Sequence, residues 1–224
     1  MQFDLFEKST NAILGAATYE EFHKKLAESN CSICLGLCEN RHTIVVDRGN
    51  PASKIVLIGE APGENEDLQG KAFVGRAGQL LDKIMAAIGL DTNKDTLILN
   101  VVKCRPPENR APTPEEAKNC FPYLEWQLNT VKPAVIVLLG ATAARYFLPK
   151  ARDKNMADQV GQFFTAPDYP GVQFMLLYHP AYLLRDPRKK KDMWEHVKGL
   201  HNWLLSQKLV STKTRNRLPV EVPL

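Results

Sequence analysis

The stretch KIVLIGEAPGENED, residues Lys54 to Asp67, begins as an apolar run and becomes polar at Glu60. The run KIVLIG is rich in β-branched residues and shows no clean alternation of apolar and polar positions. This pattern is typical of a strand that is covered on both faces, as in a parallel sheet. Three other runs share it: TLILNVV (Thr96–Val102), AVIVLLG (Ala134–Gly140) and VQFMLLYH (Val172–His179). The sequence therefore predicts four buried parallel strands.

Segments with helical periodicity lie between these runs, at residues 76–89, 113–131 and 141–148, and another follows the last run, at residues 190–209. The second of them has a strong start signal, because Thr113 can cap the helix while Glu116 completes a capping box. Pro122 inside it is expected to kink or restart the helix. Strands that alternate with helices predict an α/β fold, with a parallel sheet layered between helices.

The chain has 224 residues, and we expect a single domain over residues 1–210. Residues 1–30 are expected to form a helical N-terminal extension of it, and the basic tail 211–224 is expected to be flexible. No apolar run reaches the length of a membrane span, and the first residues do not begin a signal peptide. We therefore expect a cytoplasmic protein whose cysteines bind a metal or act in catalysis rather than form disulfides. We also expect the protein to be a monomer.

The net charge of +4 is mild, but it is unevenly distributed. The run RDPRKKK, from Arg185 to Lys191, carries five basic residues and one acid, so its net charge equals that of the whole chain. Such a run on its own is most often a solvated surface segment. It also has the composition of a patch that contacts phosphates.

Polar side chains mark the ends of three of the four predicted strands. Glu60 follows the first strand, Asn100 lies among apolar neighbours in the second, and His179 ends the fourth. In an open α/β sheet, ligands bind beyond the carboxyl ends of the strands. Each residue alone has a structural explanation, such as capping a loop. A carboxylate, an amide and an imidazole on one rim together predict an active site.

The loop from Ala61 to Gly75 matches neither a P-loop nor a dinucleotide-binding motif. Its acids would repel phosphates unless a metal intervened. Phe73 stands in a glycine-flanked polar loop and has no obvious role in a core. We interpret Phe73 as a pocket wall or a stacking surface.

The cysteines form a second constellation. Cys31 and Cys34 make a C-x-x-C pair, while Cys104 and Cys120 stand on either side of a proline-rich loop. Four thiolates suit either tetrahedral zinc or a [4Fe–4S] cluster, and the spacing does not choose between them. The alternative is that Cys104 and Cys120 are ordinary small buried residues.

Four motifs, in this order, resemble family 4 uracil-DNA glycosylases, the iron–sulfur members found in bacteria and archaea: GEAPGENED, GKAFVGRAGQLL, LNVVKCRPPENRAPTPEE and HPAYLLR. The resemblance runs from about Cys31 to the last helix. It implies the three-layer α/β/α uracil-DNA glycosylase fold with a central four-stranded parallel sheet. It also implies a [4Fe–4S] cluster of structural function on Cys31, Cys34, Cys104 and Cys120.

The resemblance also implies residue roles in the cleavage of uracil from DNA. Glu60 would orient water or stabilise the sugar cation, and His179 would face uracil O2. Phe73 would stack on the base and Asn100 would read its polar edge, with Gly59 and Ala61 as further uracil contacts. The expected DNA contacts are Leu183, in the loop that wedges into the base stack, and the basic residues Arg185, Arg188, Lys189 and Arg105.

Two other functions remain open from the residues alone. A metal-dependent phosphohydrolase would use the acids of GENED and lose its activity in EDTA. A non-catalytic nucleic-acid-binding module would hold zinc on the cysteines and be colourless. The expected partner under the resemblance is uracil-containing DNA, with no membrane.

Overall fold

The computed structural model describes residues 10–148 and 156–210. At its centre is a six-stranded sheet with the strand order β1-β3-β2-β4-β6-β5. Every residue of β2, β3 and β4 is buried, which explains why these runs show no alternation in the sequence. Four neighbouring parallel strands correspond to the four predicted runs: β3 (Leu97–Asn100), β2 (Ile55–Gly59), β4 (Val135–Leu139) and β6 (Gln173–Leu177).

The sheet is mixed, which corrects the prediction of a four-stranded parallel sheet. The edge strand β1 (Arg48–Gly49) pairs antiparallel with β3. The opposite edge strand β5 (Phe163–Phe164) pairs antiparallel with β6. Each edge strand has only two residues, and a segment of that length carries no periodic signal in the sequence.

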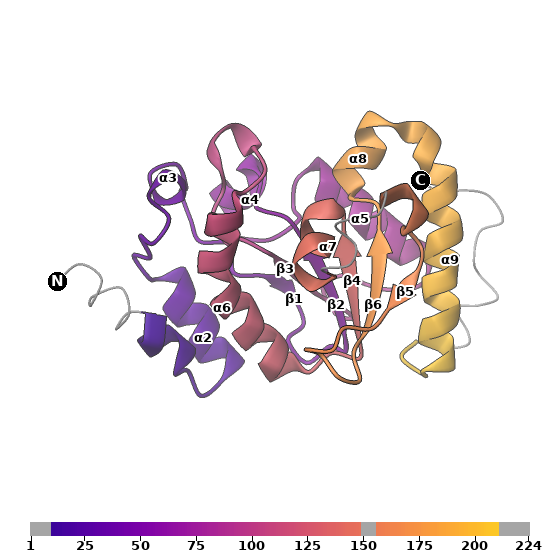
Figure 1. The fold of residues 1–224 in the computed structure, drawn as a ribbon, viewed down its shortest axis with the longest axis horizontal. Helices are drawn as coiled ribbons and strands as arrows, with labels where there is room; N and C mark the ends of the chain where they lie inside the picture. The colour runs from indigo at the N-terminus through magenta and orange to yellow at the C-terminus, as the bar shows by residue number, and fades with distance from the viewer. Residues whose placement is uncertain (1–9, 149–155, 211–224) are drawn as a thin grey trace.

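Helices cover both faces of the sheet (Figure 1). The chain crosses the sheet in one direction from β2 to β3, and in the other direction from β3 to β4 and on to β6. Because parallel crossovers are right-handed, α5 packs on one face while α6 and α7 pack on the other. The helices are α2 (Tyr19–Ala27), α3 (Leu35–Cys38), α4 (Glu64–Gln69), α5 (Arg76–Ala87), α6 (Pro114–Val131), α7 (Ala141–Phe147), α8 (Pro180–Arg185) and α9 (Lys190–Ser206).

The predicted capping box of α6 is present. The Thr113 hydroxyl accepts the Glu116 N–H at 3.2 Å, and the Glu116 carboxylate accepts the Thr113 N–H at 2.7 Å. Pro122 was predicted to kink or restart this helix, and the restart does not occur, because α6 runs through Pro122 as one helix of 18 residues. A proline removes one backbone hydrogen bond, and the buried apolar face of α6 compensates for that loss.

Two hydrophobic clusters hold the chain together. The larger cluster surrounds the sheet, and the smaller one joins α2 to α6. Phe22 of α2 stacks on Trp126 of α6, with ring centroids 4.1 Å apart and the ring planes 5° from parallel. The four cysteines of the second constellation lie in or against the smaller cluster. The N-terminal helix therefore packs on the segment that carries the cysteines.

The predicted flexible tail, 211–224, and the first nine residues lie outside the described residues. Across 10–148 and 156–210, every helix falls short of the length or the apolarity that crossing a bilayer requires.

Candidate active site

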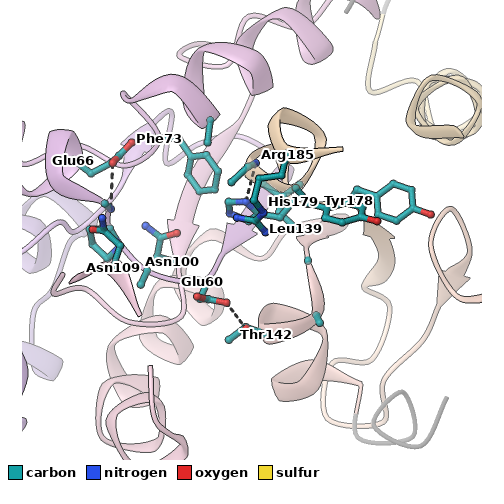
Figure 2. A pocket seen from close by; sticks show the side chains of 18 of the residues that line it. Glu60, Glu66, Phe73, Asn100, Asn109, Leu139, Thr142, Tyr178, His179 and Arg185 are labelled. Carbon is teal, nitrogen blue, oxygen red and sulfur yellow. Dashed lines mark hydrogen bonds between the residues drawn. The ribbon is translucent and has the colours of Figure 1, made fainter. Parts of the chain in front are cut away.

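A cavity of about 630 Å³ opens at the carboxyl ends of the parallel strands. The structure brings Glu60, Phe73, Asn100 and His179 together in its wall. Figure 2 shows that these four side chains converge from different segments of the chain. Gly59 closes β2 directly beneath them, and Ala61 also lines the cavity.

The side-chain amide of Asn100 lies in this wall and is only 2% exposed. In the described part of the chain, neither its Nδ2 nor its Oδ1 has a hydrogen-bond partner. A buried polar group left without a partner costs about 1–3 kcal/mol. An amide supplies both a donor and an acceptor, so this site is prepared for a ligand that presents the complementary pair.

Gly59 is the residue that permits this arrangement. A Cβ atom on it would lie 2.6 Å from Asn100 Oδ1 and 2.5 Å from the Phe73 ring. Any larger residue would therefore displace both side chains. The glycine explains how an aromatic ring and an amide can share one end of β2 and β3.

His179 caps the N-terminus of α8, where its Nδ1 accepts the backbone N–H of Ala181 at 3.2 Å. We therefore assign the proton of the neutral imidazole to Nε2, so that Nε2–H can donate a hydrogen bond to a ligand. Burial, followed by the charge of Arg185, lowers the pKa of His179 to about 4. The ring is therefore neutral at pH 7. The Phe73 ring lies 5.6 Å away, between centroids.

The carboxylate of Glu60 is held in place by a residue that sequence reasoning missed. Thr142, in the first turn of α7, donates its hydroxyl proton to Glu60 Oε2. In the sequence, Thr142 stands among small residues in GATAA, and nothing in the local pattern marks it as a site residue. The signal that could have been used is a hydroxyl group three residues after the end of β4.

Two of the three acids of GENED, Glu66 and Asp67, have structural roles. Glu66 accepts the backbone N–H of Gly75 at 2.7 Å and that of Gly63 at 3.1 Å, and so closes the loop after β2. Asp67, fully buried, accepts the backbone N–H groups of His42 and Thr43. Because these carboxylate oxygens accept hydrogen bonds from backbone N–H groups, they do not converge on one point where they could bind a metal ion together.

The predicted DNA contacts separate into two groups. Arg185 and Lys189 line the cavity, and Lys189 also pairs with Asp192 at 2.9 Å. Arg188 is 90% exposed and pairs with Asp186 outside the cavity wall. Arg105 is only 16% exposed and lies 3.7 Å from a Glu64 oxygen.

The prediction of Leu183 as a DNA contact needs correction. Leu183 is fully buried in the main hydrophobic cluster, whereas its neighbour Leu184 is 37% exposed. On a helix such as α8, consecutive side chains point in different directions, so a one-residue error exchanges core for surface.

The loop between Cys104 and Cys120 reaches the cavity, since Pro106, Asn109 and Arg110 line it. Arg110 forms a bidentate ion pair with Glu116, with N–O distances of 2.8 and 2.6 Å. The proline-rich loop therefore forms part of the cavity wall. From the sequence, only Arg105 of this loop was named, as a DNA contact.

Each of the four candidate ligand sulfurs faces a hydrogen-bond donor. Arg41 Nη1 lies 3.3 Å from Cys104 Sγ, and the Lys103 N–H lies 3.3 Å from Cys120 Sγ. The corresponding donors are Asn119 at 3.8 Å for Cys34 and the Tyr123 hydroxyl at 3.9 Å for Cys31. Cys38 differs, because its thiol donates to a carbonyl of its own helix.

Burial raises the pKa of the Cys104 thiol to about 11 and that of Cys120 to about 12. Among the described residues, no three His, Cys, Asp or Glu side chains are placed closely enough to hold a metal ion. All five cysteines are free of disulfides.

The family model described as Uracil DNA glycosylase superfamily matches residues 46–198 of this chain. The type-4 uracil-DNA glycosylase of Thermotoga maritima is 42% identical over 178 residues, which cover 75% of this chain and 86% of that protein. The type-4 enzyme of Archaeoglobus fulgidus is 40% identical over 73% of this chain and 82% of its own length. The type-4 enzyme of Saccharolobus solfataricus is 38% identical, with 79% and 83% covered. The chain belongs to the type-4 uracil-DNA glycosylase family, which confirms the resemblance.

Proposed function

We propose that this chain is a DNA-repair glycosylase that flips uracil out of DNA and hydrolyses its N-glycosidic bond, leaving an abasic site. The observation that carries the residue assignment is the unpartnered amide of Asn100 beside Phe73 in the cavity. An enzyme that acts on a base within a duplex must extrude it into a pocket. The cavity supplies an aromatic face, an amide and an imidazole for such a base.

Base recognition is assigned to Asn100 and Phe73. The Asn100 amide donates to uracil O4 and accepts from N3–H, while the Phe73 ring stacks on the base. Cytosine presents the reversed pattern at these two positions. A bound cytosine would leave the buried amide unpaired, at about 1–3 kcal/mol for each group.

Bond cleavage develops negative charge on uracil and positive charge on the sugar. His179 is neutral at pH 7 and presents Nε2–H, which donates to uracil O2 as the charge develops. A single preorganised donor of this kind is worth roughly 3 kcal/mol. Glu60, fixed by Thr142, either orients the attacking water or stabilises the sugar cation.

DNA contacts are assigned by exposure. Arg185 and Lys189 stand at the cavity wall, where they would bind phosphates that flank the flipped nucleotide. Leu184 replaces Leu183 as the apolar side chain that enters the base stack, because only Leu184 reaches the surface. Arg188 and Arg105 remain secondary candidates.

We assign a [4Fe–4S] cluster as the cofactor, with Cys31, Cys34, Cys104 and Cys120 as its ligands, because the type-4 relatives point to an iron–sulfur family. The support is chemical: the four cysteines, from three segments, lie in or against one hydrophobic cluster, and each sulfur faces a donor of the kind that stabilises cluster thiolates. To bind the cluster, the sulfurs would have to lie closer together than they do among the described residues. When bound, the cluster would supply cross-links between the N-terminal segment and the loop that lines the cavity.

One incubation tests the activity. A uracil-containing oligonucleotide is treated with the protein in EDTA and then cleaved by alkali at any abasic site. The proposal expects strand cleavage at the uracil position, whereas a metal-dependent phosphohydrolase would be silent in EDTA. A brown protein with iron and acid-labile sulfide is expected, and a colourless zinc protein would contradict the cluster. Sedimentation would test the proposed monomer, and cell fractionation would test its cytoplasmic location.

A further inference from the structure

We propose that Arg48 is a positioning residue for the base-stacking ring, acting by holding the backbone of Phe73. The inference rests on the proposed stacking role of Phe73. Arg48 lies on the edge strand β1 and is not among the residues that line the cavity. Any effect of Arg48 on base release must therefore pass through another residue.

The backbone of Phe73 needs external support. Its φ angle is +54°, in the left-handed region that a bulky side chain rarely adopts. The position of the ring depends on this angle, because the ring follows the direction of the Cα–Cβ bond. In a relaxed backbone the ring would leave its place beside Asn100 and His179.

Two neighbours hold Phe73 in this conformation. Gly78, in the first turn of α5, leaves the space that the Phe73 carbonyl occupies, since a Cβ on Gly78 would collide with that oxygen. From the other side, Arg48 Nη1 donates to the same carbonyl oxygen at 2.7 Å. The peptide is therefore enclosed between a helix and a guanidinium group.

The guanidinium group itself is rigidly oriented. Its Nη2 donates to Asp82 Oδ1 and to the Thr92 hydroxyl, and its Nη1 lies 3.3 Å from Asp82 Oδ2. Thr92 in turn donates to Asp82 at 2.7 Å. The Arg48 side chain is only 10% exposed. A planar fork that is fixed at two points can place its remaining N–H with little freedom.

A double-mutant cycle separates positioning from simple structural support. The variants are Arg48→Met, Phe73→Ala and the two combined, and the measurement is the single-turnover rate of uracil release in EDTA. Displacing a group in an active site by about 1 Å can lower the reaction rate by up to about 100-fold. Arg48→Met should therefore lower the rate of uracil release roughly tenfold to 100-fold. In the Phe73→Ala background, the same substitution should change the rate by less than about twofold, because the ring that it positions is gone.

The fold should survive Arg48→Met, because Asp82 is 39% exposed and water can replace its lost partner.

Lys54→Met is the matched control. Lys54 Nζ caps the carbonyls of Val131 and Lys132 at 3.2 and 3.1 Å, outside the cavity wall, so its loss should leave the rate unchanged. Arg48→Lys should restore part of the rate, since an ammonium group can reach one acceptor but cannot form the fork.

The outcomes are distinct. If Phe73→Ala keeps the wild-type rate, the proposed stacking role fails. If Phe73→Ala is slow but the losses are additive, or if Arg48→Met keeps the wild-type rate, the positioning role of Arg48 is overturned. If Arg48→Met does not fold, Arg48→Lys carries the cycle, and additive losses with that variant overturn the proposal equally.

Discussion

Asn100→Ala should make the protein less active and more stable at the same time. The amide is 2% exposed and neither of its polar atoms has a partner within the described residues, so the free protein bears the desolvation of both. An unpaired buried group costs about 1–3 kcal/mol, and its removal should raise the free energy of unfolding by a similar amount. For a chain of this size, 1 kcal/mol corresponds to roughly 2–4 °C in melting temperature.

The same substitution removes two hydrogen bonds to the base. At about 1–3 kcal/mol for each group, the transition state loses roughly 2–6 kcal/mol. With about 1.4 kcal/mol for each factor of ten, the single-turnover rate should fall roughly 30-fold to 10⁴-fold. A site that is strained for its ligand typically shows this opposition between stability and activity.

The assay pairs thermal unfolding with single-turnover uracil release in EDTA. Asn50→Ala is the control, because both polar atoms of the Asn50 side chain are hydrogen-bonded in a turn: Nδ2 donates to Lys94 O at 2.8 Å, and Oδ1 accepts the Ala52 N–H at 2.9 Å. That variant should lose stability and keep its activity. A wild-type rate in Asn100→Ala, or a melting temperature below that of wild type, would refute the reasoning.

Three further predictions follow from the site. Because burial lowers the pKa of His179 from 6.5 to about 4, the folded state binds fewer protons than the unfolded state between these values. The free energy of unfolding is therefore unaffected by the protonation of His179 above pH 6.5 and should fall by up to about 3 kcal/mol as the pH drops toward 4. Urea titrations at several pH values should show this fall in the wild-type protein and a smaller one in His179→Gln. Leu184→Ala should reduce release from duplex DNA with little change in melting temperature, whereas Leu183→Ala should cost about 2–5 kcal/mol of stability. Gly59→Ala should slow uracil release, since its Cβ would meet both the Phe73 ring and the Asn100 amide, and an unchanged rate would show that the cavity can adapt.

The parallel strands were readable because each is a buried run of apolar residues. The edge strands β1 and β5 were not, since two residues carry no period and their pairing depends on neighbours distant in sequence. Pro122 was expected to kink or restart a helix, and α6 continues through it because tertiary packing compensates for the lost backbone hydrogen bond.

The site shows the same division. The positions of Glu60, Asn100 and His179 at strand ends were predictable, because parallel strands end on one rim. The supporting contacts were not. Thr142 reaches Glu60 from α7, and Arg48 reaches Phe73 from β1, across separations that no local pattern encodes. Leu183 and Leu184 are equally apolar in the sequence, and only the packing of α8 tells them apart.

By itself, the sequence determined the α/β fold class and the polar residues at the strand ends. It also determined the resemblance to the family and the four cysteines that are candidate cluster ligands. These follow from periodicity and motif, which are properties of neighbouring residues. The tertiary structure decided that Asn100 has no partner, that Phe73 is held at a positive φ, and that the loop between Cys104 and Cys120 lines the cavity. Each of these is a statement about what surrounds a side chain, and that depends on which distant segments fold against it.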